Sequence, residues 1–295
     1  MQENLYMNGK IGIIGGSGFY NIDGIKDVKA VKVSTPFGDP SAEYVTGVLE
    51  GAEVIFLARH GKGHRVLPSE INYRANIYGM KTLGVERIIS VSACGSLKEE
   101  LKPLDIVVPS QFVDRTNYGR EMTFFGSGIV AHIQFADPVC PHLSKELYDA
   151  GIKAGASMHL GGTYINMEGP QFSTKAESYL YRSWGMDIIG MTNLAEAKLA
   201  REAEICYATL ACITDYDCWH NDQAVESVSL EMIIQNLLKN VEVSKKIVKS
   251  VLPKLGRPRD CVCVSALKDS IVTRPEAIPA KKKKDLELII GKYIK

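Results

Sequence analysis

The run Ala208-Thr209-Leu210-Ala211-Cys212-Ile213 is apolar on both faces of an extended chain. This pattern is typical of a central strand covered by helices on both sides, because a half-exposed strand alternates apolar with polar residues. Similar runs predict further buried strands at residues 11–14, 54–57, 87–91 and 105–108. Amphipathic periodicity predicts helices at residues 69–83, 174–184, 193–204 and 229–250. This alternation of strands and helices predicts an α/β protein.

The bulk composition is that of a globular protein. The chain has 295 residues, 45% hydrophobic and 23% charged, which is enough for one large α/β domain or two smaller ones. Thirty-five Lys and Arg residues against thirty-four Asp and Glu residues give no reason to expect nucleic acid or an anionic membrane as a partner. Since neither a signal-like N-terminus nor an apolar stretch of about 18 residues is present, we expect a cytoplasmic protein.

The chain changes character after Pro253, where Arg257-Pro258-Arg259 leads to Cys261-Val262-Cys263 and to a lysine run at residues 281–284. About 40 residues are too few for an independent core. We therefore assign residues 9–256 to the main domain and residues 257–295 to a C-terminal extension packed on it.

Three motifs follow predicted strands, where open α/β sheets place their ligands. Residues 12–18 are glycine-rich and suit a phosphate, but the helix and acidic residue that a dinucleotide-binding loop requires do not follow. Arg59 and His60 suit phosphate oxygens, although a solvated basic loop has the same composition. Residues 90–96, which include Ser92, end in small residues, and each of these motifs is also compatible with a tight turn. All three motifs are compatible with a phosphate-binding site, and we expect no nicotinamide cofactor.

Later segments suit the recognition of a planar base. Phe172 follows Gly169-Pro170 at a helix entrance, where an aromatic ring stacks on a base or acts as a hydrophobic staple. Thr192 starts the next helix, as a phosphate ligand or as an N-cap. Asp215 and Asp217 follow the predicted central strand without a suitably spaced His or Cys cluster, so we predict no metal. A carboxylic acid pair can recognise and protonate a nitrogen base: one oxygen accepts from an exocyclic amine while a protonated oxygen donates to a ring nitrogen.

Taken together, these motifs resemble the trimeric class of purine nucleoside phosphorylases and, within it, the 5′-methylthioadenosine phosphorylases. The resemblance extends in order from residue 11 to about residue 250. It rests on residues 12–18, 35–39, 57–61, 72–77, 93–97, 105–107, 168–170 and Thr214-Asp215-Tyr216-Asp217-Cys218-Trp219. It implies one α/β domain whose central mixed sheet is partly barrel-like and flanked by helices.

The resemblance also implies roles for individual residues. The implied phosphate ligands are Ser17, Arg59, His60, Ser92, Ala93 and Thr192. The implied contacts to base and ribose come from Phe172, Met191, Ala93, Asp215 and Asp217. The implied apolar pocket for the 5′ substituent consists of Leu230, Ile233 and Ile234, whose spacing places them on one helix face. His132 corresponds to a residue that reaches the site from a neighbouring subunit, which implies a homotrimer or a dimer of trimers.

The implied reaction is phosphate-dependent cleavage of 5′-methylthioadenosine, and of adenosine by extension, to adenine and 5-methylthioribose 1-phosphate. Inorganic phosphate is the co-substrate, no cofactor is expected, and catalysis is assigned to Arg59, His60, Asp215 and Asp217. Two alternatives stay open. One is a phosphorylase of broader specificity that accepts inosine or guanosine. The other is a non-catalytic protein that binds adenine nucleosides.

The motif Cys261-Val262-Cys263 has no counterpart in the common pattern of this family. Seven cysteines are present, an odd number that leaves at least one unpaired within a chain. Cysteines inside cells are ordinarily reduced thiols, whereas intracellular proteins of hyperthermophiles carry disulfides. Our hypothesis for this motif is a stabilising or redox-active disulfide in a thermophile.

Overall fold

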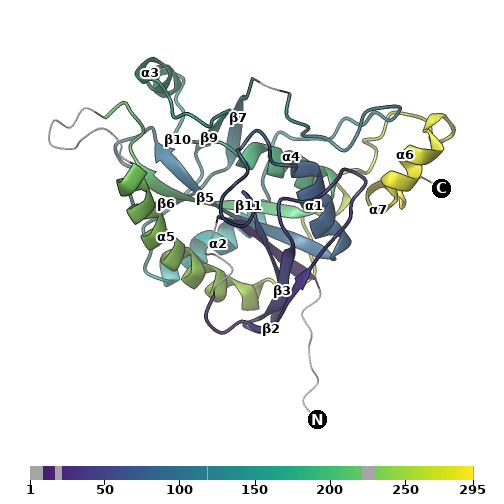
Figure 1. Ribbon diagram of the computed structural model, residues 1–295, viewed down its shortest axis with the longest axis horizontal. Coiled ribbons are helices and arrows are strands. Elements are labelled where there is room, and N and C mark those ends of the chain that lie inside the picture. The colour runs from purple at the N-terminus through teal and green to yellow at the C-terminus, as the bar shows by residue number, and fades with distance from the viewer. Residues whose placement is uncertain (1–8, 17–21, 118, 221–229, 295) are drawn as a thin grey trace, which may run out of the picture.

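The computed structural model describes residues 9–16, 22–117, 119–220 and 230–294. Within these ranges eleven strands form one mixed sheet flanked by helices, which confirms the predicted fold class (Figure 1). The strands are β1 (Lys10–Gly15), β2 (Lys26–Val31), β3 (Tyr44–Leu49), β4 (Ala52–Ala58), β5 (Val85–Ser96), β6 (Ile106–Val108), β7 (Gln111–Arg115), β8 (Met158–Leu160), β9 (Thr163–Met167), β10 (Ile188–Gly190) and β11 (Cys206–Asp215).

The strand predicted to be central, β11, is buried along all ten residues. It pairs in parallel with β5, from Cys206 opposite Arg87 to Asp215 opposite Gly95, and in antiparallel with β6. Strand β5 has twelve residues, which is long enough to pair with β1 near its start and with β10 at its end. The sheet therefore branches at β5, and its main path runs β2-β3-β4-β1-β5-β10-β9-β7.

Helices cover both faces of the sheet: α2 and α5 lie on one side, and α1 and α4 lie on the other (Figure 1). The helices are α1 (Tyr73–Thr82), α2 (Pro141–Lys153), α3 (Lys175–Ser183), α4 (Asn193–Glu202), α5 (Leu230–Val251), α6 (Ala280–Asp285) and α7 (Glu287–Ile290). Short 3-10 helices span Leu252–Lys254, Val262–Ser265 and Pro275–Ala277. No described helix is long and apolar enough to cross a membrane.

Capping side chains determine where two of the predicted helices begin. Helix α1 starts later than its periodicity predicts, because Asn72 is its N-cap and accepts a hydrogen bond from the amide of Ala75. Helix α3 starts as predicted after Thr174, which forms a capping box with Glu177. Helix α2 and strands β3, β7, β8 and β9 were not predicted.

The C-terminal extension packs on the main domain. Leu267, Ile278 and Leu286 belong to the same buried cluster as α1 and α4 residues, and Tyr293 donates a hydrogen bond to Glu204 at 2.5 Å. The extension also forms a β-bridge between Ile271 and Ala131. Described residues after position 257 therefore share a buried core with α1 and α4.

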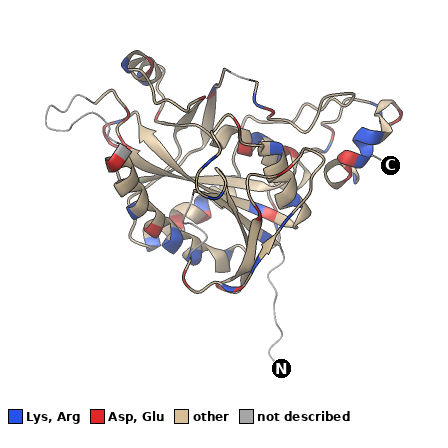
Figure 2. Ribbon diagram, in the orientation of Figure 1, with Lys and Arg blue, Asp and Glu red and all other residues tan. Residues whose placement is uncertain are grey.

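The structure does not support the disulfide hypothesis, because all seven cysteines are free thiols. The two cysteines of the 261–263 motif are buried instead in a core cluster with residues of α2, β11 and α5. Lys and Arg residues are interspersed with Asp and Glu residues on the helices and loops, while the central strands carry few charges (Figure 2).

Candidate functional site

The carboxyl ends of four parallel strands meet at one edge of the sheet. Strand β1 pairs in parallel with β4 and β5, and β5 pairs in parallel with β11. The register places Gly15 opposite Ala58, and Asp215 opposite Gly95. The chain segments that carry Arg59 and Asp215 therefore leave the sheet at the same edge, and Ser92 lies within β5, four residues before its end. Ser17 lies outside the described residues.

Arg59 is a buried side chain that joins three strand ends to α4. Its Nε and Nη2 donate to the carboxylate of Glu196 at 2.5 and 3.2 Å. Its Nη1 donates to the carbonyl of Val91 at 3.0 Å, and Nη2 donates to Ser90 Oγ at 2.6 Å. Burial alone would lower the pKa of Arg59, but the adjacent Glu196 carboxylate raises it overall. Arg59 thus stays charged, with most of its N–H donors already used inside the protein.

A buried polar network supports this ion pair from the core side. Glu196 also accepts hydrogen bonds from Ser90 and from the Tyr207 hydroxyl, each at 2.8 Å. Asn193, the first residue of α4, has amide contacts of 2.9 to 3.1 Å with Ser90, Tyr207 and Thr209. Because these groups are buried and partnered, the network fixes the start of α4 relative to the strand ends.

His60 is half-buried beside Arg59. Its Nδ1 lies 2.8 Å from the carbonyl of Val66, so that nitrogen must carry the proton. Burial, followed by the charge of Arg59, lowers the pKa of His60 to about 4. The neutral ring therefore presents Nε2 as a hydrogen-bond acceptor, which suits the hydroxyl of a hydrogen phosphate ion.

Asp215 and Asp217 form a buried carboxyl pair at the end of β11. The oxygens of Asp215 accept from Thr214 Oγ1 at 2.6 Å and from the amide of Asp217 at 2.9 Å. Burial raises the pKa of Asp215 to about 6, and the charge of Asp217 acts in the same direction. Burial also raises the pKa of Asp217, while the nearby hydroxyls of Ser178 and Ser173 act in the opposite direction. By distance and angle, the buried Oδ2 of Asp217 accepts no hydrogen bond among the described residues. A buried acceptor without a hydrogen bond lowers the stability of the folded protein. A donor group on a bound ligand would supply the missing hydrogen bond.

The glycine opposite Asp215 leaves room beside its carboxyl group. A Cβ atom on Gly95 would lie 3.3 Å from Asp215 Oδ2 and 3.0 Å from a methyl group of Ile189. Any side chain at this position would therefore displace its neighbours. The absence of a side chain lets a planar group approach the Asp215 carboxyl group along β5.

Thr192, Met191 and Phe172 lie on the segments that the sequence indicates. Thr192 is 4% exposed and occupies the N-cap of α4 without a side-chain capping bond. Met191 follows β10, and its sulfur lies close to Gly169. Phe172 is 55% exposed on the loop before α3. Ala93 and Ser92 occupy β5, partly and fully buried.

Arg120 is the residue that sequence reasoning missed. Its Nε donates to Glu168 Oε1 at 2.9 Å, and its Nη groups donate to the carbonyls of Glu168 and Met191, each at 2.5 Å. The guanidinium thus connects the loop that contains Gly169-Pro170 to the segment that leads into α4. Arg120 stands alone in an irregular stretch, and no local motif indicates it.

A cavity of about 550 Å³ lies away from the carboxyl pair, between β7, α4 and the loop that follows β7. Arg120 is the one residue that it shares with the site. Its lining is Asp114, Thr116, Asn117, Gly119, Arg120, Met122, Thr123, Ala131, Ile133, Phe135, Lys198 and Glu202. Neither Arg59 nor Asp215 lines this cavity, so we place the chemistry at the strand ends rather than here.

The remaining predicted site residues lie on the segment between β7 and α2 and on α5. His132 is exposed, and its amide donates to the carbonyl of Ser270 in the C-terminal extension. Ile233 is half-buried and Ile234 is 46% exposed on α5. Leu230 is the first residue of α5, and its side chain lies outside the described residues.

Comparison with known proteins identifies the family. The sequence model of the phosphorylase superfamily matches residues 10–253. The chain belongs to the phosphorylase superfamily. An S-methyl-5′-thioadenosine phosphorylase of Geobacter sulfurreducens is 60% identical over 96% of this chain and 99% of its own length. Another, from Thermosynechococcus vestitus, is 54% identical over 98% of this chain and all of its own length.

Solved structures of this superfamily have the same fold. A methylthioadenosine phosphorylase from an antarctic soil metagenomic library superposes with a TM-score of 0.90 at 48% identity, and covers 96% of this chain and 99% of its own. The enzyme of Schistosoma mansoni superposes with a TM-score of 0.79 at 37% identity over 88% of this chain and 96% of its own. The superfamily match ends at residue 253, shortly before the extension that carries Cys261 and Cys263.

The raised pKa of Asp215 predicts a stability effect in this phosphorylase. Its folded-state pKa of about 6 exceeds the unfolded value of about 3.9, so the folded state holds the proton more tightly. Stability is therefore lost as pH rises from 4 to 7, by up to about 3 kcal/mol for this group. We expect Asp215→Asn to remove this loss. Relative to its own free energy of unfolding at pH 4, the variant should therefore lose less stability at pH 7.5 than the parent does.

Urea titrations of both proteins between pH 4 and pH 8, at one protein concentration, measure this difference. Other groups titrate in the same range, but they cancel when the two proteins are compared. Parallel stability curves for parent and variant would show that Asp215 titrates normally.

Proposed function

We propose that this chain catalyses phosphate-dependent cleavage of S-methyl-5′-thioadenosine to adenine and 5-methylthioribose 1-phosphate. The buried Asp215–Asp217 pair beside Gly95 carries the proposal, because it offers a proton and an unpaired acceptor to one planar base. The full-length relatives and solved structures named as methylthioadenosine phosphorylases support the same substrate.

The purine leaves with negative charge that the site must neutralise. A protonated Asp215 donates to N7 of the departing base, and a pKa of about 6 keeps part of this carboxyl group protonated near neutral pH. Asp217 Oδ2 accepts from the 6-amino group, which supplies the partner that this buried atom lacks. Phe172 stacks on the base and Met191 contacts the ribose.

Phosphate attacks C1′ as the ribosyl group acquires oxocarbenium character, so catalysis here is positioning together with electrostatic stabilisation. Thr192 offers its hydroxyl to the phosphate. The first backbone amides of α4, a ten-residue helix, add further donors, because a helix N-terminus attracts anions. His60 accepts the phosphate hydroxyl, and Ser92, Ala93 and Ser17 complete the set. Arg59 contributes its charge, partly compensated by Glu196.

The 5′ substituent is assigned to Leu230, Ile233 and Ile234 near the start of α5. His132 is assigned to the site of a neighbouring copy in a homotrimer or a dimer of trimers, and its exposure on this chain supports that assignment. The cytoplasmic location expected from the sequence belongs to this proposal, and the seven free thiols are compatible with it.

Release of free base from S-methyl-5′-thioadenosine, adenosine and inosine, each with and without inorganic phosphate, tests the proposal. We expect adenine from the 6-amino substrates only when phosphate is present. Inosine carries the acceptor O6 in place of the 6-amino group, so Asp217 receives no hydrogen bond from the base. The loss of this hydrogen bond to a charged group should lower kcat/KM by about 10- to 100-fold. Base release without phosphate would indicate a hydrolase, and binding without any release would indicate a nucleoside-binding protein.

A further inference from the structure

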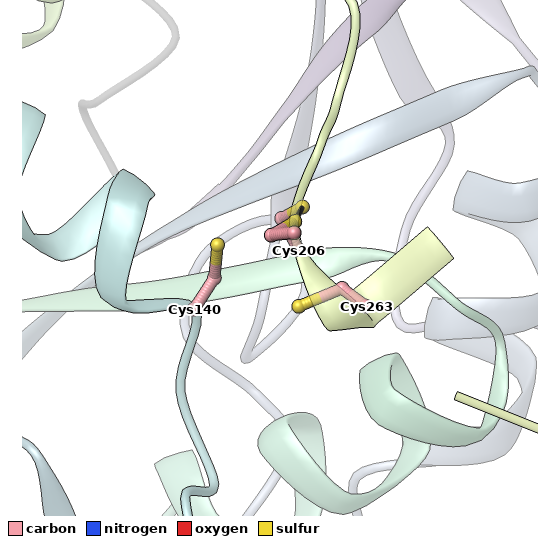
Figure 3. A group of neighbouring side chains, drawn as sticks. Cys140, Cys206 and Cys263 are labelled. Carbon is pink, nitrogen blue, oxygen red and sulfur yellow. Dashed lines mark hydrogen bonds between the residues drawn. The ribbon is translucent and has the colours of Figure 1, made fainter. Parts of the chain in front are cut away.

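Four buried cysteines from three distant parts of the chain converge at the end of the sheet opposite the proposed site. Cys140 precedes α2, Cys206 begins β11, and Cys261 and Cys263 belong to the C-terminal extension. Each is at most 8% exposed, and all four lie in one core cluster. Figure 3 shows Cys140, Cys206 and Cys263 around a common space between a helix start, a strand and a short 3-10 helix.

The four sulfur atoms have the spacing of a tetrahedral metal centre. All of them lie within 4.8 Å of one another, and the sulfurs of Cys206 and Cys261 are 3.3 Å apart. A zinc ion with four Zn–S bonds of about 2.3 Å holds its sulfur atoms about 3.8 Å apart. The observed set therefore needs side-chain shifts of about 1 Å or less to reach that geometry. Two separate disulfides would require each sulfur to lie close to only one other sulfur. Here each sulfur lies within 4.8 Å of the other three.

The surroundings suit the negative charge that four thiolates around a divalent ion retain. Cys140 is the N-cap of α2, a thirteen-residue helix, and its side chain forms no capping hydrogen bond. The helix N-terminus stabilises a thiolate at this position. Arg87 lies opposite Cys206 in the paired strand; its Nη1 forms no hydrogen bond among the described residues and lies 3.7 Å from a carboxylate oxygen of Glu86.

We propose that Cys140, Cys206, Cys261 and Cys263 bind one zinc ion as a structural tetrathiolate site. Each thiol that is protonated beforehand releases its proton when its sulfur bonds to zinc, and no electron is transferred. With four protein ligands no coordination position stays open for substrate. Cys206 and Asp215 are the first and last residues of the ten-residue strand β11, so the proposed zinc site lies roughly 30 Å from Asp215.

The zinc site would fasten the C-terminal extension to the main domain. Cys261 and Cys263 lie in the extension, while Cys140 and Cys206 lie in the main domain. Sequence spacing could not indicate this site, because only the pair 261 and 263 is close in the chain. Binding of metal to the folded protein alone stabilises that fold.

Metal analysis of the full-length protein, purified with a thiol reductant and without chelator, tests the proposal directly. We expect about one zinc ion per chain by plasma mass spectrometry. After removal of zinc with a chelator, added Co²⁺ should give the intense thiolate-to-metal and visible d–d absorption of a tetrahedral tetrathiolate site. Zinc removal should lower the melting temperature, and zinc addition should restore it.

The variants Cys263→Ser and Cys140→Ser should lose the stoichiometric zinc and the cobalt spectrum. Cys212→Ala is the matched control, because Cys212 is equally buried in β11 but is not one of the four neighbouring sulfur ligands, and this variant should keep both. The wild-type measurements decide the question even if the variants do not fold. Reduced protein that binds neither zinc nor cobalt, iron at the site, or two disulfides in protein isolated without oxidant would each overturn the proposal.

Discussion

Asp215→Asn should lower kcat/KM for S-methyl-5′-thioadenosine by about 10²- to 10⁴-fold, the usual contribution of a general acid. Asparagine retains the shape of the side chain and an acceptor for Thr214 or for the amide of Asp217. It cannot deliver a proton to the departing purine. The loss should therefore appear in kcat as well as in kcat/KM, since the interaction matures in the transition state. Steady-state assays of adenine release at saturating phosphate measure it.

Asp149→Asn on α2 makes the same chemical change at an exposed carboxylate paired with Lys145, and it should leave the rate unchanged. The parent's kcat/KM should also decline as pH rises above the Asp215 pKa of about 6, because the required protonated form is then depleted. An Asp215→Asn variant that cleaves adenine nucleosides at the parent rate would remove the general-acid assignment.

Glu196→Ala should lower the free energy of unfolding by about 3–5 kcal/mol, because it leaves the buried Arg59 charge without its carboxylate. Hydrogen bonds from Ser90 and Tyr207 are lost in the same step. Glu196→Gln retains the shape and much of the hydrogen bonding, and should lose less. Urea titrations at a fixed protein concentration measure both variants, since stability of an oligomer depends on concentration.

Glu242→Ala on α5 is the control for this experiment. Glu242 is 67% exposed in its ion pair with Lys245, so its removal should cost no more than about 1 kcal/mol. A Glu196→Ala variant as stable as the control variant would mean that Arg59 finds another partner, such as solvent or bound phosphate.

Local patterns predicted the elements whose burial is uniform or strictly periodic. The apolar run at residues 208–213 became the centre of β11, and the capping residue Thr174 marked the start of α3. Strands β7, β8 and β9 escaped prediction because they have only three to five residues, too few to show a period, and each includes a polar residue, unlike the short apolar strand β6. Helix α2 was not predicted, although Pro141 in its first turn is a residue that often marks the start of a helix.

The sequence by itself determined the fold class, the strand-end motifs and the carboxyl pair, because each is a property of residues close together in the chain. Asp215 and Asp217 are two positions apart, so the turn after β11 alone brings them together. The Arg59–Glu196 and Arg120–Glu168 pairs join residues 137 and 48 positions apart, and the four-cysteine cluster joins Cys206 to Cys261, 55 positions later. Only the tertiary structure decided these, because strand register and helix packing, not local propensity, determine which distant side chains share one buried space.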